Sequence, residues 1–279
     1  VLVATTTTDA NGNYAFTGLT PGDYIVQVVT PSGMVQTSAN VGGDASDSDA
    51  GASGLTGCYT LPSGTTNNTV DAGFYAPAAI GDRVWLDANA NGQQDAGEAG
   101  VANVTVQLYT CVNDEPGVLV AATTTDANGN YGFTGLKPGD YAVKFITPAG
   151  YSLSPINIGA DATDSDAGTG GFTACYNLES GETDNSVDAG LYQGAAIGDR
   201  VWEDKDADGV QDAGENGIPG ATVRLYTCVN NAPGVLVATT TTDASGNYAF
   251  TGLMPGDYIV EFVTPNGYTQ TTANVGAND

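Results

Sequence analysis

The chain has 279 residues, of which 32 are acidic and only 6 basic, and its net charge is −26. Nucleic acid and anionic membrane surfaces repel so acidic a protein, so neither is an expected partner, and no apolar run is long enough to insert into a bilayer. There is no His, so a Ser or Cys nucleophile would lack its usual base, and we do not expect an enzyme.

An internal repeat of 117 residues organises the whole chain. Asp9, Asp126 and Asp243 head the same motif at this spacing. We therefore expect a window on a longer array, with linkers of about four residues that limit the relative motion of neighbouring domains. The predicted domains are a complete repeat at 80–196, the later part of a repeat at 1–79 and the earlier part of a repeat at 197–279.

Short segments of the complete repeat have the alternation of half-buried strands. Val104, Val106 and Leu108, for example, alternate with polar or aromatic residues. No convincing amphipathic helix is present, and about seven short strands with frequent turn signals favour an all-β array of β-sandwich domains. The predicted strands lie at 80–86, 104–109, 118–125, 131–133, 141–146 and 187–192.

The strand at 141–146 also predicts which side chains face the core. We expect Tyr141, Val143 and Phe145 to face inward. The intervening residues should face solvent, because Lys144 is replaced by Gln27 and Glu261 in the other two copies. The residues expected to face outward are Ala142, Lys144 and Ile146.

The loop at 87–98 predicts a calcium site. It places oxygen-bearing side chains at positions 1, 3, 5, 9 and 12 of a twelve-residue loop, with Gly92 at the sharp turn. Position 7 would contribute its backbone carbonyl, and the loop contains no His or Cys to favour zinc. The predicted ligands are Asp87, Asn89, Asn91, Gln93 (through its carbonyl), Asp95 and Glu98.

A second copy of this loop lies at 204–215. Its position 7 is Val rather than Gln, as is possible if only the carbonyl binds, and its positions 3 and 5 are Asp rather than Asn. The predicted ligands are Asp204, Asp206, Asp208, Val210, Asp212 and Glu215.

Other acidic clusters are weaker metal candidates, because clustered carboxylates repel one another unless they are solvated or bound to metal. One group is Asp161, Asp164 and Asp166, with the matching Asp44, Asp47 and Asp49. The other is the turn of Asp126, Asn128 and Asn130, for which turn chemistry alone is a sufficient explanation.

Four cysteines recur at the same repeat spacing, which is typical of an oxidising compartment. A bond between Cys111 and Cys175 would lie within one domain. The alternative pairs Cys58 with Cys111 and Cys175 with Cys228, and would join neighbouring domains. We favour the first pairing, because each domain should close independently before it is stacked.

Several motifs together resemble the B-type repeats of bacterial serine-aspartate-repeat surface proteins, which are relatives of the collagen-adhesin B domain. This resemblance covers nearly the whole chain, and it implies immunoglobulin-like sandwiches, several calcium ions per domain and a stalk at the cell surface. The motifs are Ile-Gly-Asp-Arg-Val-Trp at 80–85, the loop at 87–98, Thr-Thr-Thr-Asp-Ala-Asn-Gly-Asn-Tyr at 123–131, Gly-Leu-Lys-Pro-Gly-Asp-Tyr at 135–141, Asp-Ser-Asp-Ala at 164–167 and Val-Asp-Ala-Gly-Leu-Tyr at 187–192.

A repeated Lys–Asn cross-link, found in many collagen-adhesin relatives, is excluded because no Lys recurs between copies. The leading hypothesis is an extracellular, calcium-rigidified stalk or filament whose partners are its own neighbouring domains and other copies of itself. The alternative hypothesis is an adhesive module that binds a host, matrix or neighbouring-cell ligand through its loops.

Overall fold

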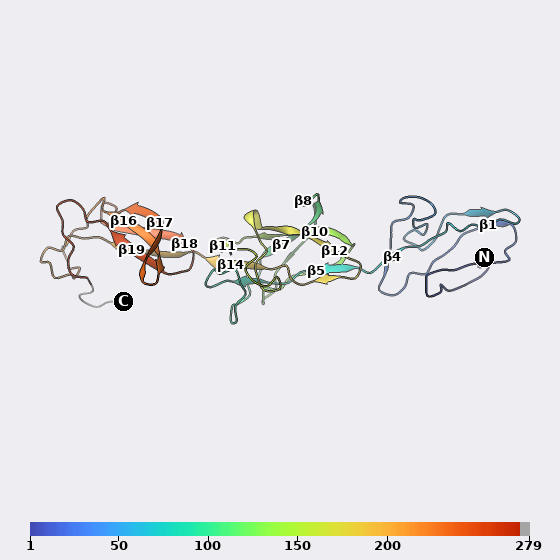
Figure 1. Cartoon of the computed structure of the whole chain (residues 1–279), viewed down its shortest axis with the longest axis horizontal. Helices are drawn as coiled ribbons and strands as arrows, with labels where there is room; N and C mark the ends of the chain where they lie inside the picture. The colour runs from blue at the N-terminus through green and yellow to red at the C-terminus, as the bar shows by residue number, and fades with distance from the viewer. Residues whose placement is uncertain (274–279) are drawn as a thin grey trace. The chain divides into compact units, whose positions relative to one another are not determined.

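The computed structural model describes residues 1–273, and it is built almost entirely from β-strands (Figure 1). The chain divides into two compact units. The first unit comprises Val1–Ala79, Thr134–Gly139 and Leu178–Thr183. The second unit comprises Ile80–Phe133, Asp140–Asn177 and Asp184–Asp279.

Short strand pairs make up the regular structure of the first unit. Strand β1 (Gly22–Tyr24) pairs with β3 (Tyr59–Leu61), and β2 (Val35–Gln36) pairs with β4 (Phe74–Tyr75), both antiparallel. Residues 1–8 nearly repeat the sequence of 118–125, yet they are exposed and form no strand. In the complete repeat that sequence pairs with residues 105–112, and residues 1–79 contain no counterpart of that segment.

A three-stranded sheet comes next in the chain. Strand β5 (Ala78–Ile80) lies between β13 (Thr183–Asp184) and β9 (Phe133–Leu136). The predicted first strand, 80–86, is in fact broken, because β5 ends at Ile80 and β6 (Val84–Leu86) begins four residues later.

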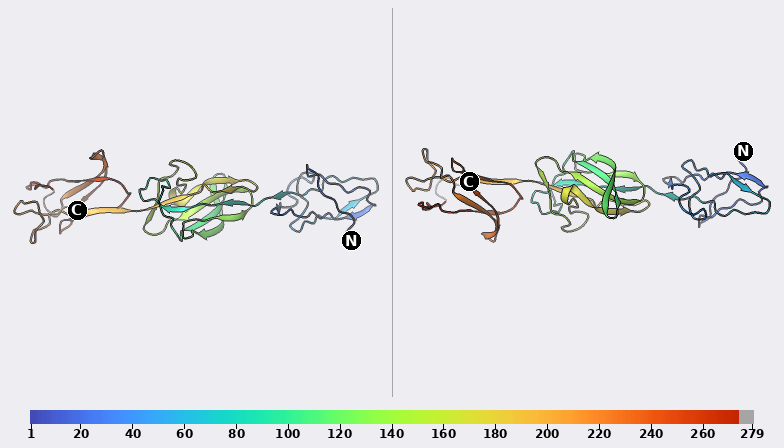
Figure 2. Two further views of the ribbon diagram at one scale, coloured as in Figure 1. Left: turned by 90° about the horizontal axis from the view of Figure 1, so that it is seen from below. Right: turned by 90° about the horizontal axis from the view of Figure 1, so that it is seen from above.

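Two sheets form the sandwich of the complete repeat. The larger sheet has the order β12-β10-β7-β8, with β12 at Phe172–Leu178, β10 at Gly139–Ile146, β7 at Thr105–Val112 and β8 at Glu115–Thr124. The second sheet has the order β11-β14-β6, with β11 at Tyr151–Leu153 and β14 at Ala189–Gln193 parallel to β6. In Figure 1, β8 and β10 lie on one side of this repeat and β14 on the other, and Figure 2 shows the same strands from below and above.

The core lies between these sheets and follows the predicted alternation. Val104, Val106 and Leu108 are fully buried, and Trp85, Phe145 and Leu191 are among the largest buried side chains. Tyr131 packs edge-on against Phe145, with ring centroids 5.4 Å apart. The expected all-β sandwich is therefore confirmed. The only helical segment within residues 1–273 is a short 3-10 turn at Thr169–Gly171.

One predicted exposure to solvent was wrong. Tyr141, Val143 and Phe145 are buried as expected, and Lys144 and Ile146 are more exposed, but Ala142 is also fully buried. Ala142 pairs with Tyr109 on β7, whose ring packs against Phe172 at 5.3 Å. Aromatic side chains on the outer face of the sheet thus cover the small alanine. The alternation of side chains along a strand does not by itself predict this covering.

The third repeat forms the remaining strands of the second unit. Strands β15 (Ala195–Arg200) and β18 (Asn247–Leu253) pair antiparallel, and β16 (Thr222–Val229) lies between β17 (Ala232–Thr241) and β19 (Tyr258–Phe262). Val223, Leu225, Phe250 and Leu253 form its buried cluster.

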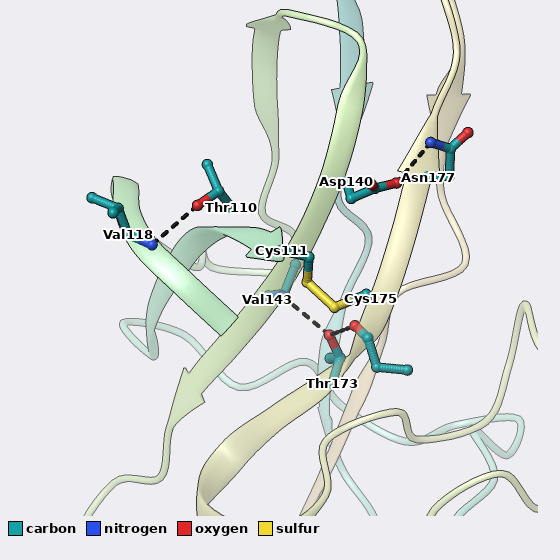
Figure 3. The surroundings of a disulfide bond; sticks show 9 residues. Thr110, Cys111, Val118, Asp140, Val143, Thr173, Cys175 and Asn177 are labelled. Carbon is teal, nitrogen blue, oxygen red and sulfur yellow. Dashed lines mark hydrogen bonds between the residues drawn. A yellow bond between two sulfur atoms is a disulfide. The ribbon is translucent and has the colours of Figure 1, made fainter. Parts of the chain in front are cut away.

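A disulfide joins Cys111 on β7 to Cys175 on β12, with the two Cα atoms 6.1 Å apart (Figure 3). Strand β10 lies between β7 and β12 in the sheet, so the bond spans the sheet where β10 begins, close to Asp140. The favoured pairing within one domain is confirmed, and Cys58 and Cys228 are unpaired.

Removal of this disulfide should destabilise the complete repeat. The cysteines are 64 residues apart, and closing so long a loop stabilises the folded state by about 4 kcal/mol through the entropy of the unfolded chain. We expect C111S/C175S to lose an amount of that order in urea unfolding. C58S/C228S is the matched control and should unfold like the parent, and an equal loss in both variants would contradict this account.

Candidate metal centre

The loop at 87–98 is organised from within by Asp87, which follows β6 directly and is fully buried. Its carboxylate accepts the N–H groups of Asn91 at 3.1 Å and Gly92 at 2.8 Å. Gly92 has a φ of 80°, and a Cβ there would lie 2.3 Å from the carbonyl oxygen of Pro155. Only glycine fits this turn, as the loop pattern predicts.

The other predicted ligands converge on the opposite side of the loop. The side-chain amides of Asn89 and Asn91 each lie 2.9 Å from the same oxygen of Asp95. Glu98 closes the loop, because its two oxygens accept the N–H groups of Ala88 and Asp95, both at 2.9 Å. The Oδ1 atoms of Asn89 and Asn91 accept the N–H groups of Asn91 at 3.0 Å and of Gln93 at 2.7 Å. An amide oxygen has two lone pairs, so each can also face a cation.

The second loop repeats this arrangement. Asp204 accepts the N–H groups of Asp208 and Gly209, and Glu215 accepts those of Lys205 and Asp212. Because Asp replaces Asn at positions 3 and 5, the carboxylate oxygens of Asp204, Asp206 and Asp208 lie within 4.8 Å of one another. The neighbouring Asp208 carboxylate raises the pKa of Asp206, as does desolvation. These like charges favour a bound cation.

The acidic segment 161–166 packs directly against the first loop. The N–H of Gln94 donates to the carbonyl of Thr163 at 2.7 Å, and the N–H of Ser165 donates to Gly92 at 3.1 Å. Gln93 and Asp164 also form an isolated β-bridge. The structure thus joins two of the predicted clusters into one acidic region, although about seventy residues separate them in the chain.

Within this region the three carboxylates of Asp161, Asp164 and Asp166 have oxygens within 4.8 Å of one another. Asp164 and Asp166 are buried, and the Oδ1 atom of Asp164 makes no hydrogen bond. Burial raises the pKa of Asp164 and raises that of Asp166 to about 6. An unpartnered, buried carboxylate oxygen beside two other carboxylates fits a divalent cation with oxygen ligands.

The matching segment in the first unit is arranged differently. Asp49 is buried and the Oδ1 atom of Asp47 makes no hydrogen bond, yet the oxygens of Asp44, Asp47 and Asp49 are not among the convergent groups found within residues 1–273. Residues 1–79 contain no counterpart of the loop 87–98 on which the segment 161–166 is held. In the complete repeat, the two backbone hydrogen bonds given above hold the acidic segment against the loop.

Asp188 is a buried acid that the sequence analysis did not single out as a candidate. It is fully buried, its Oδ1 accepts the N–H of Arg83 at 3.1 Å, and its Oδ2 makes no hydrogen bond. Its own N–H donates to the carboxylate of Asp166 at 2.7 Å. Burial, followed by the charge of Asp82, raises the pKa of Asp188 to about 8. Its place in the Val-Asp-Ala-Gly motif was the available signal, since Asp71 contacts Asp49 in the same way.

The turn at Asp126–Asn130 has its carboxylate already occupied. One oxygen of Asp126 accepts the N–H groups of Asn128 and Asn130, at 2.8 and 2.9 Å, and the other accepts the Asn130 amide. The backbone N–H groups lower the pKa of Asp126, and Asp9 and Asp243 make the same contacts. These are the contacts of a self-contained Asx turn.

Arg83 connects this turn to the loop 87–98. Its Nε donates to the carbonyl of Asn128 at 3.1 Å and its Nη2 donates to the carbonyl of Glu98 at 3.0 Å. Arg200 makes the same two bonds to Ser245 and Glu215 in the next repeat. Both hydrogen bonds of the arginine guanidinium thus recur in the two repeats.

Arg83→Ala should destabilise the complete repeat by about 1–3 kcal/mol, because two charge-assisted hydrogen bonds are lost at a partly exposed site. Arg83→Lys should recover little, since an ammonium group cannot make both bonds in the fixed geometry of a guanidinium. Urea unfolding measures the loss, and hydrogen exchange should show faster exchange of the amides at 87–98. Full rescue by lysine would show that only the charge matters.

Without metal, stability should fall as the pH rises. The folded-state pKa values of Asp166 and Asp188, about 6 and about 8, lie above the ordinary carboxyl value of 3.8, so the folded protein binds these protons more tightly. Their contribution to stability is complete below about 4 and is lost as the pH passes about 6 and then about 8. Urea unfolding in chelator across this range measures the slope.

Asp188→Asn should reduce the part of this slope above pH about 6, because the contribution of Asp166, whose pKa is about 6, is lost at lower pH. A slope that persists unchanged in the variant would show that other carboxyl groups cause it.

Comparison with known proteins shows that this chain is similar, over nearly its whole length, to the repeat domains of bacterial surface proteins. The SdrD B-like domain matches residues 1–74, 78–191 and 195–279. The chain belongs to the SdrD B-like domain family. This membership places it outside the cell, as a repeat module of a bacterial surface protein.

Two relatives are much longer than this chain. Serine-aspartate repeat-containing protein F of Staphylococcus epidermidis is 41% identical over 280 residues, which are 99% of this chain and 15% of the relative. Serine-aspartate repeat-containing protein D of Staphylococcus aureus (strain NCTC 8325 / PS 47) is 39% identical over 282 residues, which are 100% of this chain and 20% of the relative. The chain thus spans a fifth or less of each.

Among solved structures, the Bacillus anthracis TIE protein is 18% identical, with a TM-score of 0.35, and the alignment covers 95% of this chain and 40% of that one. This likeness is too distant to support an argument. Within residues 1–273, no helix has the length and apolar character needed to cross a membrane.

Proposed function

We propose that this chain is a structural segment of an extracellular stalk or filament, in which bound calcium stiffens each repeat. The observation that carries this proposal is the acidic region where the loop 87–98 holds the segment 161–166. It combines convergent oxygen donors with the unpartnered, buried Oδ1 atom of Asp164.

The donor chemistry favours calcium over other cations. Calcium takes six to eight oxygen ligands in flexible geometry. Both loops offer carboxylate and backbone oxygens, and the first loop adds the amide oxygens of Asn89 and Asn91. Bound calcium would supply the positive charge that offsets the repulsion among these carboxylates. The residues that would hold it are Asp87, Asn89, Asn91, Asp95 and Glu98 in the first loop, Asp204, Asp206, Asp208, Asp212 and Glu215 in the second, and Asp161, Asp164 and Asp166 beside the first.

The acidic loop recurs in two repeats, as expected for a structural role. The two loops share the same frame of hydrogen bonds, and Arg83 and Arg200 secure both in the same way. Groups that repeat with every domain support the domains themselves, and the partners of the chain are then its own neighbouring repeats and further copies.

Calcium removal tests the proposal. A ligand that binds only the folded state, present at a hundredfold excess over its dissociation constant, stabilises that state by about 2.7 kcal/mol. Chelation should therefore lower the melting temperature of the protein. An unchanged melt in excess chelator, with the absence of metal confirmed by mass spectrometry, would overturn the proposal.

Loop variants locate the effect. Asp95 is exposed and lies where both Asn amides converge, so Asp95→Ala should weaken the first loop for calcium by roughly tenfold or more through loss of one anionic ligand. Asp212→Ala should do the same in the second loop. Glu179→Ala removes one exposed charge from the same repeat and is the matched control. Calorimetric titration with calcium should show no change for this control, and equal weakening in all three variants would indicate a general charge effect.

A further inference from the structure

Two edge strands of the second unit expose an unusual run of apolar side chains. Strand β8 is the outer strand of its sheet and has β7 as its one strand neighbour there. Val118, Leu119 and Val120 are 73%, 48% and 47% exposed. Strand β17 repeats this at the edge of the next sheet, where Val235, Leu236 and Val237 are 74%, 50% and 45% exposed.

Simple burial on one face of a sheet does not account for this run. Successive side chains of a strand point to opposite faces, so a strand packed on one core should bury every second residue. Three consecutive exposed apolar residues mean that neither face is covered at this point. An edge strand also leaves backbone N–H and C=O groups open to pair with another strand.

The exposed run is also uncharged in both copies. Residues 116–125 and 233–242 contain no charged side chain, in a protein whose net charge is −26. Two copies of so acidic a chain repel one another over most of their surface, and the repulsion is weakest where the facing strands are neutral.

We infer that β8 and β17 are docking edges through which copies of this chain associate side by side, strand against strand. The expected occupant is a second copy, because that copy offers the same neutral, open edge, and antiparallel pairing of identical strands satisfies both partners equally. The inference deepens the proposed stalk or filament function by naming the contact between chains, but it requires no calcium at that contact.

A single strand pair is too small an interface for stable association, so several repeats are needed. One pair of strands buries far less than the roughly 1,200 Å² of a stable protein–protein interface. Each repeat contributes one such edge, so a chain of several repeats can gain affinity from several contacts at once.

The ends of the edge limit its pairing. In β8 the register with β7 shifts beside Leu119 and Val120, and such a bulge twists an edge strand. Asp114 and Glu115 precede the neutral run and Asp126 follows it. Pairing is thereby confined to a short stretch, which favours a defined contact over open-ended aggregation.

The test compares two lysine pairs in the full chain. Val120→Lys with Val237→Lys places a charge on each edge, as natural edge strands do to block pairing. The control is Thr20→Lys with Met254→Lys, since both positions are exposed and correspond to Lys137 of the complete repeat. Both pairs reduce the net negative charge equally, so general electrostatics would strengthen association equally in the two variants.

Sedimentation velocity in ~1 M sodium chloride, where the screening length is about 3 Å, should show association of the parent chain and of the control. The edge variant should associate roughly tenfold more weakly or not at all, because unpaired lysines block strand addition. Hydrogen exchange should show protection of the amides at 118–124 on association. A parent chain that stays monomeric in this salt, or an edge variant that associates like the control, would overturn the inference.

Repeating the measurement in calcium and in chelator separates this inference from the calcium proposal, with circular dichroism confirming the fold. Association that persists in chelator and is lost in the edge variant supports the inference even if calcium proves irrelevant. Association that needs calcium and is unaffected by the edge lysines overturns the inference and leaves the calcium proposal in place.

Discussion

Repulsion between closely held carboxylates is the constraint on which the rest of this structure depends. The carboxylates of one set of acids accept backbone hydrogen bonds. In another set, each carboxylate keeps one buried oxygen that makes no hydrogen bond. Asp87 and Asp126 belong to the first set, because their oxygens accept N–H groups of their own loops. Asp164 and Asp188 belong to the second, since each keeps a buried oxygen without a hydrogen bond. Acids of the first set shape a loop, whereas acids of the second set require positive charge or a proton.

The same short sequence therefore behaves differently in different surroundings. The Asp-Ser-Asp segment converges beside the loop 87–98 but not in residues 1–79, where no such loop is present. Residues 118–125 form most of an edge strand beside β7, whereas the nearly identical residues 1–8 form none. In the complete repeat, both segments are held by partners from elsewhere in the chain.

This dependence explains what could be predicted from the sequence. The turn of the loop 87–98 was predictable because its polar side chains and its obligatory glycine lie within twelve consecutive residues. The sandwich followed from alternation, and the disulfide followed from the closure of one domain. The packing of 161–166 on that loop, the role of Asp188 and the two bonds of Arg83 could not be predicted, because each joins segments that are distant in the chain. The burial of Ala142 was missed for a similar reason, since the aromatic side chains that cover it come from β7 and β12.

The disulfide has a consequence for a chain that is pulled from its two ends. The cysteines lie 64 residues apart, and a fully extended chain spans at most about 3.4 Å per residue, so the bond withholds roughly 220 Å of contour length from stretching. When tension unfolds the complete repeat, only the residues before Cys111 and after Cys175 can extend. Strands β8 and β10 lie wholly inside the closed loop and carry no load once it is exposed. The bond therefore shortens each yielding step and keeps the middle of the repeat ready to refold when the force is released.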